Sequence, residues 1–522
     1  MSTPRSYLSD AALGLSEAAP RALPQDFAIA LVSSVLDGGV VVKALLVLGL
    51  WLAGWGASRL VADVVPAAGL AGQFVAATLA IWNPYVAERL LQGHWSLLVG
   101  YGCLPWVATA VVRLREGTGS WWPLPFWVAL AGLTPTGLIL AAVVALASVA
   151  APGAGKPRWA CAAVSLGTAV LAAAPWLLAS ALAGSLSSTQ ATGVPAFAAR
   201  AEPGLGTLGS LAGLAGIWNG QAVPDSRTTL FAAVATVVLL AVVGLGLPTA
   251  VRRPAAVPLL VLAAAAVVLP AAVATGPGVA LLESLVRTVP GLGVLRDGQK
   301  WVALAIPGYA LAGASAVVTL RPRVPAIVTA TVACLALMAV LPDLAWGVGG
   351  KVSAVRYPPG WATVAGLINA DPRPVAVLPP DVMREFSWAG TAPVLDPLPR
   401  WVAADVLATG DLVIGEQTVP GEGERAREVQ RLLVSGASAD ELAASGVGWV
   451  VVEAGGSVPS LDLPVVHRDD DLVLYRVGAD RPAADGRGVM IGAHLAWLGL
   501  LLIGAVGCIR DLLARRKKEL RN

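Results

Sequence analysis

The sequence predicts a mainly α-helical, polytopic membrane protein: a bundle of transmembrane helices with a small extracytoplasmic α/β domain before the last helix. Of its 522 residues, 56% are hydrophobic and only 13% are charged, and the mean hydropathy is +0.73. This composition is typical of a membrane protein rather than of a soluble one. Apolar runs long enough to cross a bilayer recur along the chain, and one long polar block, 346–488, interrupts them.

The predicted transmembrane segments number about eleven. Two of them are the halves of an apolar stretch that is broken at Thr134–Gly137 (TPTG). A broken helix is tolerated in a membrane only where neighbouring helices or a water-filled cavity satisfy the freed backbone groups, so the break indicates a cavity. The other segments are 39–62, 67–83, 95–113, 159–182, 229–250, 254–275, 300–320, 324–345 and 489–509.

The positions of Lys and Arg predict the orientation. They fall in alternate short connections, which the positive-inside rule places in the cytoplasm together with the basic C-terminal tail. The protein is thus predicted to be multi-pass in the cell membrane, with its long polar segments outside. The cytoplasmic cations are Arg113, Arg115, Lys156, Arg158, Arg252, Arg253, Arg321, Arg323 and the tail 515–518. The outer segments are 1–38, 82–95, 183–228, 276–299 and 346–488.

Net charge and cysteine usage exclude other classes. The formal net charge of +3 is small and follows the topology, so no nucleic-acid partner is predicted. The four cysteines lie far apart in apolar segments and form no CxxC pair. This pattern excludes a disulfide framework and a thiolate metal site, and no metal-binding residue is predicted.

The stretch 82–95 (WNPYVAERLLQGHW) is unusually polar for the end of a membrane hairpin. Pro84 ends the incoming helix, and a short helix after it places Tyr85, Arg89 and Gln92 on one face. One interpretation is an interfacial helix with aromatic anchors and an Arg89 side chain that snorkels to water. The other is the polar rim of a membrane-embedded site.

A second cluster of charges stands at the end of the loop 276–299. Arg296, Asp297 and Lys300 directly precede an apolar run on the side where cations are scarce. They are either a snorkelling cation pair balanced by Asp297 or a clamp for a lipid-linked phosphate, with Arg89 as a third donor. The candidate substrate-binding residues are Asn83, Arg89, His94, Arg296, Asp297 and Lys300.

Carboxylates on the same side are candidates for a general base, although each alone is more often a solvated loop acid. They are Asp10 and Asp26 in the first loop, Glu88 in the stretch 82–95, and Asp225 in the loop 183–228.

The block 346–488 is predicted to be a separate small α/β domain, between a membrane domain over 1–345 and a final helix and tail over 489–522. Three short β-type runs lie at 375–379, 448–453 and 472–477. The segment ERAREVQRLLVSG is typical of a helix that ends at Gly436, and Ser438 to Glu441 form a capping-box pattern. With no Gly-rich phosphate loop and no metal cluster, the domain is interpreted as a binding or docking module.

These motifs together resemble the GT-C superfamily of polyprenyl-phosphate-dependent glycosyltransferases, in particular the bacterial cell-wall arabinofuranosyl- and mannosyltransferases. The resemblance implies an outward-facing cavity, a polyprenyl-phosphate sugar donor, and a glycan or glycolipid acceptor. It also implies a general base in the first outer loop, and cations or a divalent metal ion that stabilise the departing phosphate. The resembling segments are 20–26 (PRALPQD), 82–95, 134–137, 217–220 (GIWN), 295–301 (LRDGQKW), 357–361 (YPPGW), 395–397 (LDP) and 446–453.

The chain departs from the family in one respect. In the family a transmembrane helix precedes the first outer loop and carries the catalytic acid at its outer end, whereas this chain begins inside the loop. Asp26 is then the remaining candidate for the catalytic base. Two other classes stay open: a lipid or polymer transporter, for which the TPTG break is the evidence, and a non-catalytic assembly protein, which needs no base.

Overall fold

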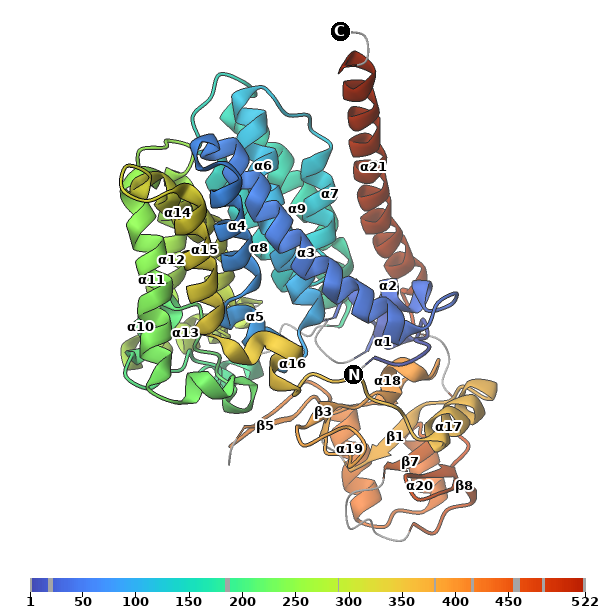
Figure 1. The fold of residues 1–522 in the computed structure, drawn as a ribbon. Helices are drawn as coiled ribbons and strands as arrows, with labels where there is room; N and C mark the ends of the chain where they lie inside the picture. Colours follow the sequence, from blue (N-terminus) through green and yellow to red (C-terminus); the bar gives the residue numbers. More distant parts are fainter. Residues whose placement is uncertain are drawn as a thin grey trace.

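A computed structural model describes residues 2–16, 22–183, 188–289, 291–379, 382–414, 417–453, 461–480 and 484–519. It is mainly helical, with a long helix bundle and a small α/β domain at one end of it (Figure 1). The bundle contains α3 (Gly38–Val64), α4 (Gly69–Ile81), α6 (Trp95–Glu116), α7 (Pro123–Ala131), α8 (Pro135–Val149), α9 (Arg158–Ala183), α11 (Phe231–Ala250), α12 (Val257–Val273), α14 (Ile306–Leu320), α15 (Ala326–Ala339) and α21 (Arg487–Glu519).

Six helical stretches among the described residues are long and apolar enough to cross a membrane: Gly38–Val64, Trp95–Glu116, Arg158–Leu182, Phe231–Ala250, Gln299–Leu320 and Arg487–Ala514. Two bent pairs raise the number to eight if each pair is one span. One pair joins α12 to α13 (Gly276–Thr288) at 91°, and the other joins α15 to the segment Pro342–Gly349 at 79°. The structure therefore confirms that several helices are long and apolar enough to span a membrane, and the count of eleven stays a prediction because α4 and α8 are shorter.

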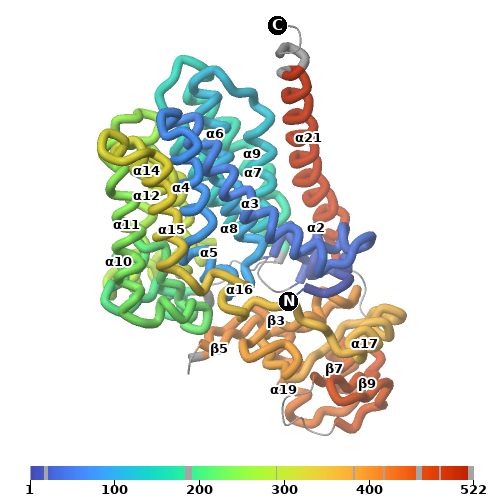
Figure 2. The backbone as a smooth tube through the Cα atoms, viewed as in Figure 1, coloured from blue at the N-terminus to red at the C-terminus, as the bar shows by residue number. Residues whose placement is uncertain are grey.

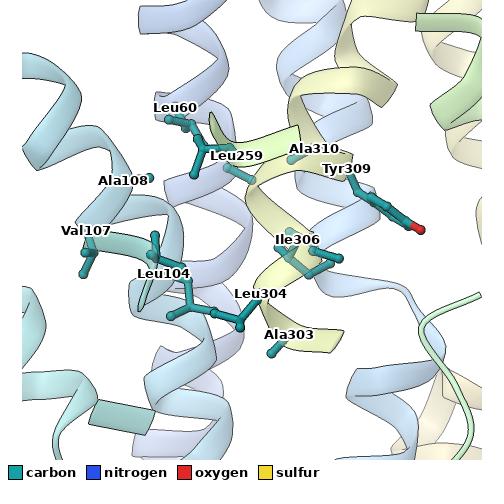
Figure 3. Packing of buried hydrophobic residues seen from close by; sticks show 14 of the residues in the cluster. Leu60, Leu104, Val107, Ala108, Leu259, Ala303, Leu304, Ile306, Tyr309 and Ala310 are labelled. Carbon is teal, nitrogen blue, oxygen red and sulfur yellow. The ribbon is translucent and has the colours of Figure 1, made fainter. Parts of the chain in front are cut away.

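The centre of the bundle is formed by α6 and by the stretch Gln299–Leu320, each of which is 89% buried over its apolar window. Figure 3 shows Leu104 of α6 packed beside Leu304 of this stretch. Small residues allow the close approach. A Cβ on Gly102 would lie 2.2 Å from the carbonyl oxygen of Gly49 on α3, and such contacts favour association of apolar helices.

The predicted break at TPTG is confirmed. Helix α7 ends at Ala131, and α8 begins at Pro135 with the Thr134 side chain accepting a hydrogen bond from the Gly137 N–H at 3.1 Å. The start of α7 and the end of α8 both lie near the C-terminal end of α6. Helix α7 follows α6 after a short connection, and Arg115 of α6 donates to the carbonyl oxygen of Ala151, just after α8, at 3.1 Å. The two halves therefore form a helical hairpin that packs against α6.

Shorter helices lie at the end of the bundle that adjoins the α/β domain (Figure 1). The predicted loop 276–299 contains α13, and the predicted loop 183–228 contains α10 (Gly206–Ala212). The polar stretch 82–95 forms α5 (Pro84–Leu91), which confirms the short helix predicted there. The remaining short helices in this region are α1 (Asp10–Leu13), α2 (Gln25–Val32) and α16 (Ala345–Gly349).

The α/β domain is built on a five-stranded sheet of order β4-β1-β7-β9-β8, in which β1 runs parallel to β4 and β7, and β9 runs antiparallel to β7 and β8. Its strands are β1 (Val375–Leu378), β4 (Val406–Leu407), β7 (Trp449–Glu453), β8 (Val465–Arg468) and β9 (Leu472–Arg476). Successive side chains of a strand point to opposite faces. One face packs against α17 (Pro359–Ala370) and the other against α19 (Glu424–Val434) and α20 (Ala439–Ala444).

The elements predicted in this domain are present. Strands β1, β7 and β9 occupy the three β-type runs, α19 ends shortly before Gly436, and Ser438 and Glu441 form the predicted capping box of α20. Helix α17 and the short strand β4 were not predicted. Two small hairpins complete the domain, β2 (Met383–Arg384) with β3 (Val394–Leu395), and β5 (Leu412–Ile414) with β6 (Gln417–Val419). The turn α18 (Leu398–Trp401) follows β3.

Candidate functional site

Helix α5 owes its position to Asn83, which caps it. The Asn83 Oδ1 atom accepts a hydrogen bond from the Val86 N–H at 3.1 Å, and Pro84 occupies the first turn, where its missing N–H costs nothing. Asn83 Nδ2 donates to the carbonyl oxygen of Leu79 at 2.8 Å and to the Tyr101 hydroxyl at 3.0 Å. The side chain is fully buried. Asn83, predicted to bind substrate, thus joins α4 to α5 and α6 from within the protein.

Arg89 is the centre of a buried polar cluster rather than a snorkelling side chain. It is completely buried, and its two Nη atoms donate to the two carboxylate oxygens of Asp297 at 3.0 and 3.3 Å. Nη1 also lies 3.2 Å from His94 Nδ1, and Nη2 donates to the side-chain carbonyl of Gln299. The planar guanidinium fork suits this two-point contact with a carboxylate. The structure thus brings Arg89, His94 and Asp297 together.

Glu88, the neighbour of Arg89, joins a third segment to this cluster. Its carboxylate accepts hydrogen bonds from the backbone N–H groups of Gly216 and Ile217, both at 3.2 Å, and from Gln299 Nε2 at 2.8 Å. Asn219 Nδ2 donates to Gln92 Oε1 at 2.8 Å. Residues of 82–95, 217–220 and 295–301, three of the segments that carry the family resemblance, therefore meet in one network, here called the Arg89 cluster.

Burial and charge perturb the titration of the Arg89 cluster. Burial, followed by the nearby Glu202 carboxylate, raises the pKa of Glu88 to about 8. Burial and the adjacent Arg89 cation lower the pKa of His94 to about 3, so its imidazole is neutral at physiological pH. Burial alone would raise the pKa of Asp297, but Arg89 and Lys300 outweigh it and hold this pKa below its usual range. The Arg89–Asp297 pair is therefore ionised.

Lys300 and Arg296 lie beside the cluster and are half-buried. The backbone N–H of Lys300 donates to Asp297 Oδ1 at 3.4 Å, and the side-chain Nζ of Lys300 lies 5.6 Å from the ring centroid of Trp301. The Arg296 guanidinium lies 4.4 Å over the ring of Phe197, which packs edge-on against Trp218. Lys300 therefore shares the carboxylate that binds Arg89, whereas Arg296 lies on an aromatic pair from the loop 183–228.

Asp26 lies apart from these residues, in the first turn of α2. It forms an ion pair with Arg400 of α18, with 3.1 Å between Asp26 Oδ1 and Arg400 Nε, and it also accepts a hydrogen bond from Gln25 Nε2 at 3.1 Å. Together with Arg384 and Asp396, Asp26 and Arg400 line a cavity of about 140 Å³ between the first loop and the sheet. This space is here called the loop–sheet cavity.

The other candidate bases have structural partners. Asp10 forms an ion pair with Arg487 at the start of α21 and accepts a hydrogen bond from the Ala484 N–H at 3.2 Å. Asp225 forms an exposed ion pair with Lys351 at 2.5 Å. Of the four candidates, only Asp26 lines the loop–sheet cavity.

The sequence interpretation missed a buried charged group beside this cavity. Arg384 Nε donates to Glu453 Oε2 at 2.7 Å, and Arg384 Nη2 lies 3.9 Å from Asp396 Oδ2, with all three side chains buried. Glu453 is the last residue of β7, a parallel strand that is buried along its whole length. In the sequence, the charged Glu453 at the carboxyl end of this apolar strand could have indicated the site, because ligands of open α/β sheets bind at this edge.

The residues that the structure describes do not provide a site for the divalent metal ion that the resemblance implies. Among the described residues, no three His, Cys, Asp or Glu side chains are close enough to hold a metal ion. The Asp297 carboxylate is already bound by Arg89 through both oxygens. No catalytic step is therefore derived through a metal ion.

Comparison of the chain with protein-family models, with curated proteins and with solved structures finds no match in any of the three. The functional conclusion is therefore drawn from the sites themselves and from the motifs that they bring together.

Proposed function

We propose that the protein is an integral membrane glycosyltransferase that moves a sugar from a polyprenyl-phosphate donor to a cell-envelope glycan or lipid acceptor. One observation supports this proposal most directly. The segments 82–95, 217–220 and 295–301, which lie far apart in the sequence, meet in the Arg89 cluster through side-chain and backbone hydrogen bonds. A network of this kind at the end of an apolar bundle is expected around a functional site, because buried charges cost free energy unless they are paired.

The proposed topology has about eleven membrane segments, including the re-entrant pair α7 and α8, with the α/β domain outside. Its support is the separation of charge along the bundle. In Figure 2 the far end of α21 and the connections after α6, α8, α11 and α14 lie at the end opposite to the α/β domain. These connections carry the Lys and Arg residues that the positive-inside rule assigns to the cytoplasm.

Cysteine labelling tests this topology in a variant whose four native cysteines are replaced by serine. A cysteine at the exposed Ser435 should react with a membrane-impermeant maleimide on intact cells, and one at the exposed Thr118 should react only after lysis. The opposite pattern would refute the orientation. The predicted cytoplasmic tail also includes Asn522, which lies outside the described residues.

The proposed roles follow from charge. Arg89 is neutralised by Asp297, so it positions the segment 295–301. The half-buried Lys300 and Arg296 lie beside this pair, and their proposed role is to bind the donor phosphate. In the transfer, an acceptor hydroxyl oxygen attacks the anomeric carbon, and the bond from this carbon to the phosphate oxygen breaks. Polyprenyl phosphate leaves, and the hydroxyl proton passes to a carboxylate, for which Asp26 is the candidate.

A non-catalytic assembly protein is the second candidate function. The observation that favours it is the ion pair between Asp26 and Arg400, which joins the first loop to the α/β domain. A carboxylate held in this way fits a docking contact as well as it fits a base.

Release of polyprenyl phosphate from synthetic polyprenyl-phosphate sugars tests the proposal, with the purified protein in liposomes and an acceptor oligosaccharide present. We expect release by the wild-type protein and at least a tenfold loss in Arg296→Ala, with a smaller loss in Lys300→Arg because this change keeps the charge. Arg287→Ala is the matched control, since Arg287 is an exposed cation on α13. Equal rates in Arg296→Ala and Arg287→Ala, or no release with any donor, would contradict the proposal.

A further inference from the structure

The loop–sheet cavity lies where ligands of α/β sheets bind. It adjoins the carboxyl ends of the parallel strands β1 and β4, because Val377, Leu407 and Ala408 line it. Its opposite wall comes from the first loop, through Tyr7 and Asp26. Its volume of about 140 Å³ is close to that of cavities that hold a single six-membered ring. The space therefore fits one ring-sized ligand unit.

The first loop is fastened to the domain, so this cavity exists before any ligand enters. The Tyr7 N–H donates to the carbonyl oxygen of Arg400 at 3.0 Å, and the Tyr357 hydroxyl donates to the carbonyl oxygen of Ser2 at 3.2 Å. The Asp26–Arg400 ion pair adds a third link. A preformed site loses little conformational freedom when it binds a ligand.

The charges around the cavity balance. Arg400 is paired with Asp26, and Arg384 is paired with Glu453 and lies near Asp396. Burial raises the pKa of Asp396, and burial together with Asp396 raises the pKa of Glu453 well above its usual range, which favours the neutral form of Glu453. Two cations thus face two negative charges. An anionic ligand finds no excess of positive charge here, and a cationic ligand finds no excess of negative charge.

Charged side chains form the polar part of the cavity lining. Arg384, Asp396 and the Asp26–Arg400 pair line the cavity, and Arg384 is only 5% exposed. A hydroxyl group accepts from a guanidinium and donates to a carboxylate with the same oxygen. Apolar walls from Leu395 and Pro399 face these polar groups. Donors, acceptors and apolar surface without net charge are complementary to a neutral sugar ring.

We propose that the loop–sheet cavity binds one neutral sugar residue of the acceptor glycan through Arg384, Asp396 and the Asp26–Arg400 pair. As an acceptor site it rests on the proposed function, whereas sugar binding itself needs no donor and is measured alone. The ligand enters as a single ring, and the rest of its chain extends through the open side of the cavity.

Saturation-transfer NMR and calorimetry on the full chain in nanodiscs test this proposal without donor lipid. The probes are methyl α-D-arabinofuranoside and methyl α-D-mannopyranoside, with inorganic phosphate and glucuronate as anionic comparisons. Ala408→Leu fills the cavity from its rim and should weaken sugar binding at least tenfold. Ala444→Leu places the same side chain on the exposed end of α20 and should leave binding unchanged. Arg384→Lys, which keeps the charge but loses the fork, is the second test variant and should also weaken binding.

Absence of binding by both sugars, equal binding in Ala408→Leu and the wild-type protein, or displacement of the sugar by phosphate would overturn the proposal. Unfolding temperatures of the variants identify any that do not fold, and Arg384→Lys then decides alone. Sugar binding that depends on Ala408, without polyprenyl phosphate release from any donor, would leave the cavity site standing and refute the transferase. Polyprenyl phosphate release that is unaffected by Ala408→Leu would leave the transferase standing and refute the cavity as its acceptor site.

Discussion

Removing either partner of the buried Arg89–Asp297 pair is predicted to destabilise its end of the bundle strongly. In Arg89→Met the unbranched stem is kept while the guanidinium is lost. Asp297 then remains as a buried carboxylate without its main partner, and its side chain is only 13% exposed. Removing one partner of such a pair costs about 3–5 kcal/mol, most of it from the uncompensated charge. Asp297→Leu should cost a similar amount because it leaves Arg89 unpaired.

The double variant Arg89→Met/Asp297→Leu separates this charge effect from packing. It removes both charges together, so we expect a loss smaller than the sum of the two single losses by at least about 2 kcal/mol. Unfolding in mixed detergent micelles with increasing dodecyl sulfate, followed by tryptophan fluorescence, gives the four free energies. Arg287→Met, which breaks an exposed pair with Glu283, is the control and should cost under about 1 kcal/mol. Additive losses, or an Arg89→Met loss no larger than the control, would refute this reasoning.

The remaining predictions concern three other positions. The pKa of Glu88 is raised to about 8 in the folded protein, so its neutral form stabilises the fold fully below the unfolded pKa of about 4.3, and this stabilisation is lost as the pH rises toward 8. Glu88→Gln should lack this decline, and parallel pH profiles of the unfolding temperature would contradict the assignment. In Gly193→Ala the new Cβ would lie 3.0 Å from Val419 Cγ1, so we expect it to push β6 away and to speed amide exchange at 417–419. Unchanged exchange would show that the Val419 side chain moves aside without loss of stability. Asp26→Asn should fold normally, with sugar transfer abolished if Asp26 is the base, and undiminished transfer would leave Asp26 as a docking residue.

Local patterns in the sequence predicted the elements whose cause is local. The β-type runs of β7 and β9, the capping box at Ser438 and the break at TPTG each depend on a few consecutive residues, and each is present in the structure. The two-residue strand β4 is too short to carry a pattern. Helix α13 was read as part of a loop because its polar residues lower its hydropathy, although it directly continues α12 after a bend of 91°.

Partners far apart in the chain were beyond the reach of such patterns. Arg89 and Asp297 were singled out separately, Arg89 as a donor to a phosphate and Asp297 as the acid that balances the nearby cations. Their direct pairing across 208 positions depends on how α5 packs against the segment before α14. Arg384 was not noticed because its partner Glu453 lies 69 positions away on another strand. A charge that is neutralised by a distant partner looks the same in the sequence as one that awaits a ligand.

The α/β domain contacts both polar regions of the molecule. Arg400 of α18 binds Asp26 beside the loop–sheet cavity, while Val419 of β6 and the Arg296 guanidinium both approach Gly193. Movement of the domain away from the bundle would therefore alter the surroundings of Asp26 and of Arg296 at the same time. An acceptor bound in the cavity and a phosphate bound at Arg296 would each favour the docked domain, and two ligands that favour the same state strengthen each other's binding. If the proposed acceptor and donor bind at these two places, the position of the domain is a physical route by which the binding of one promotes the binding of the other.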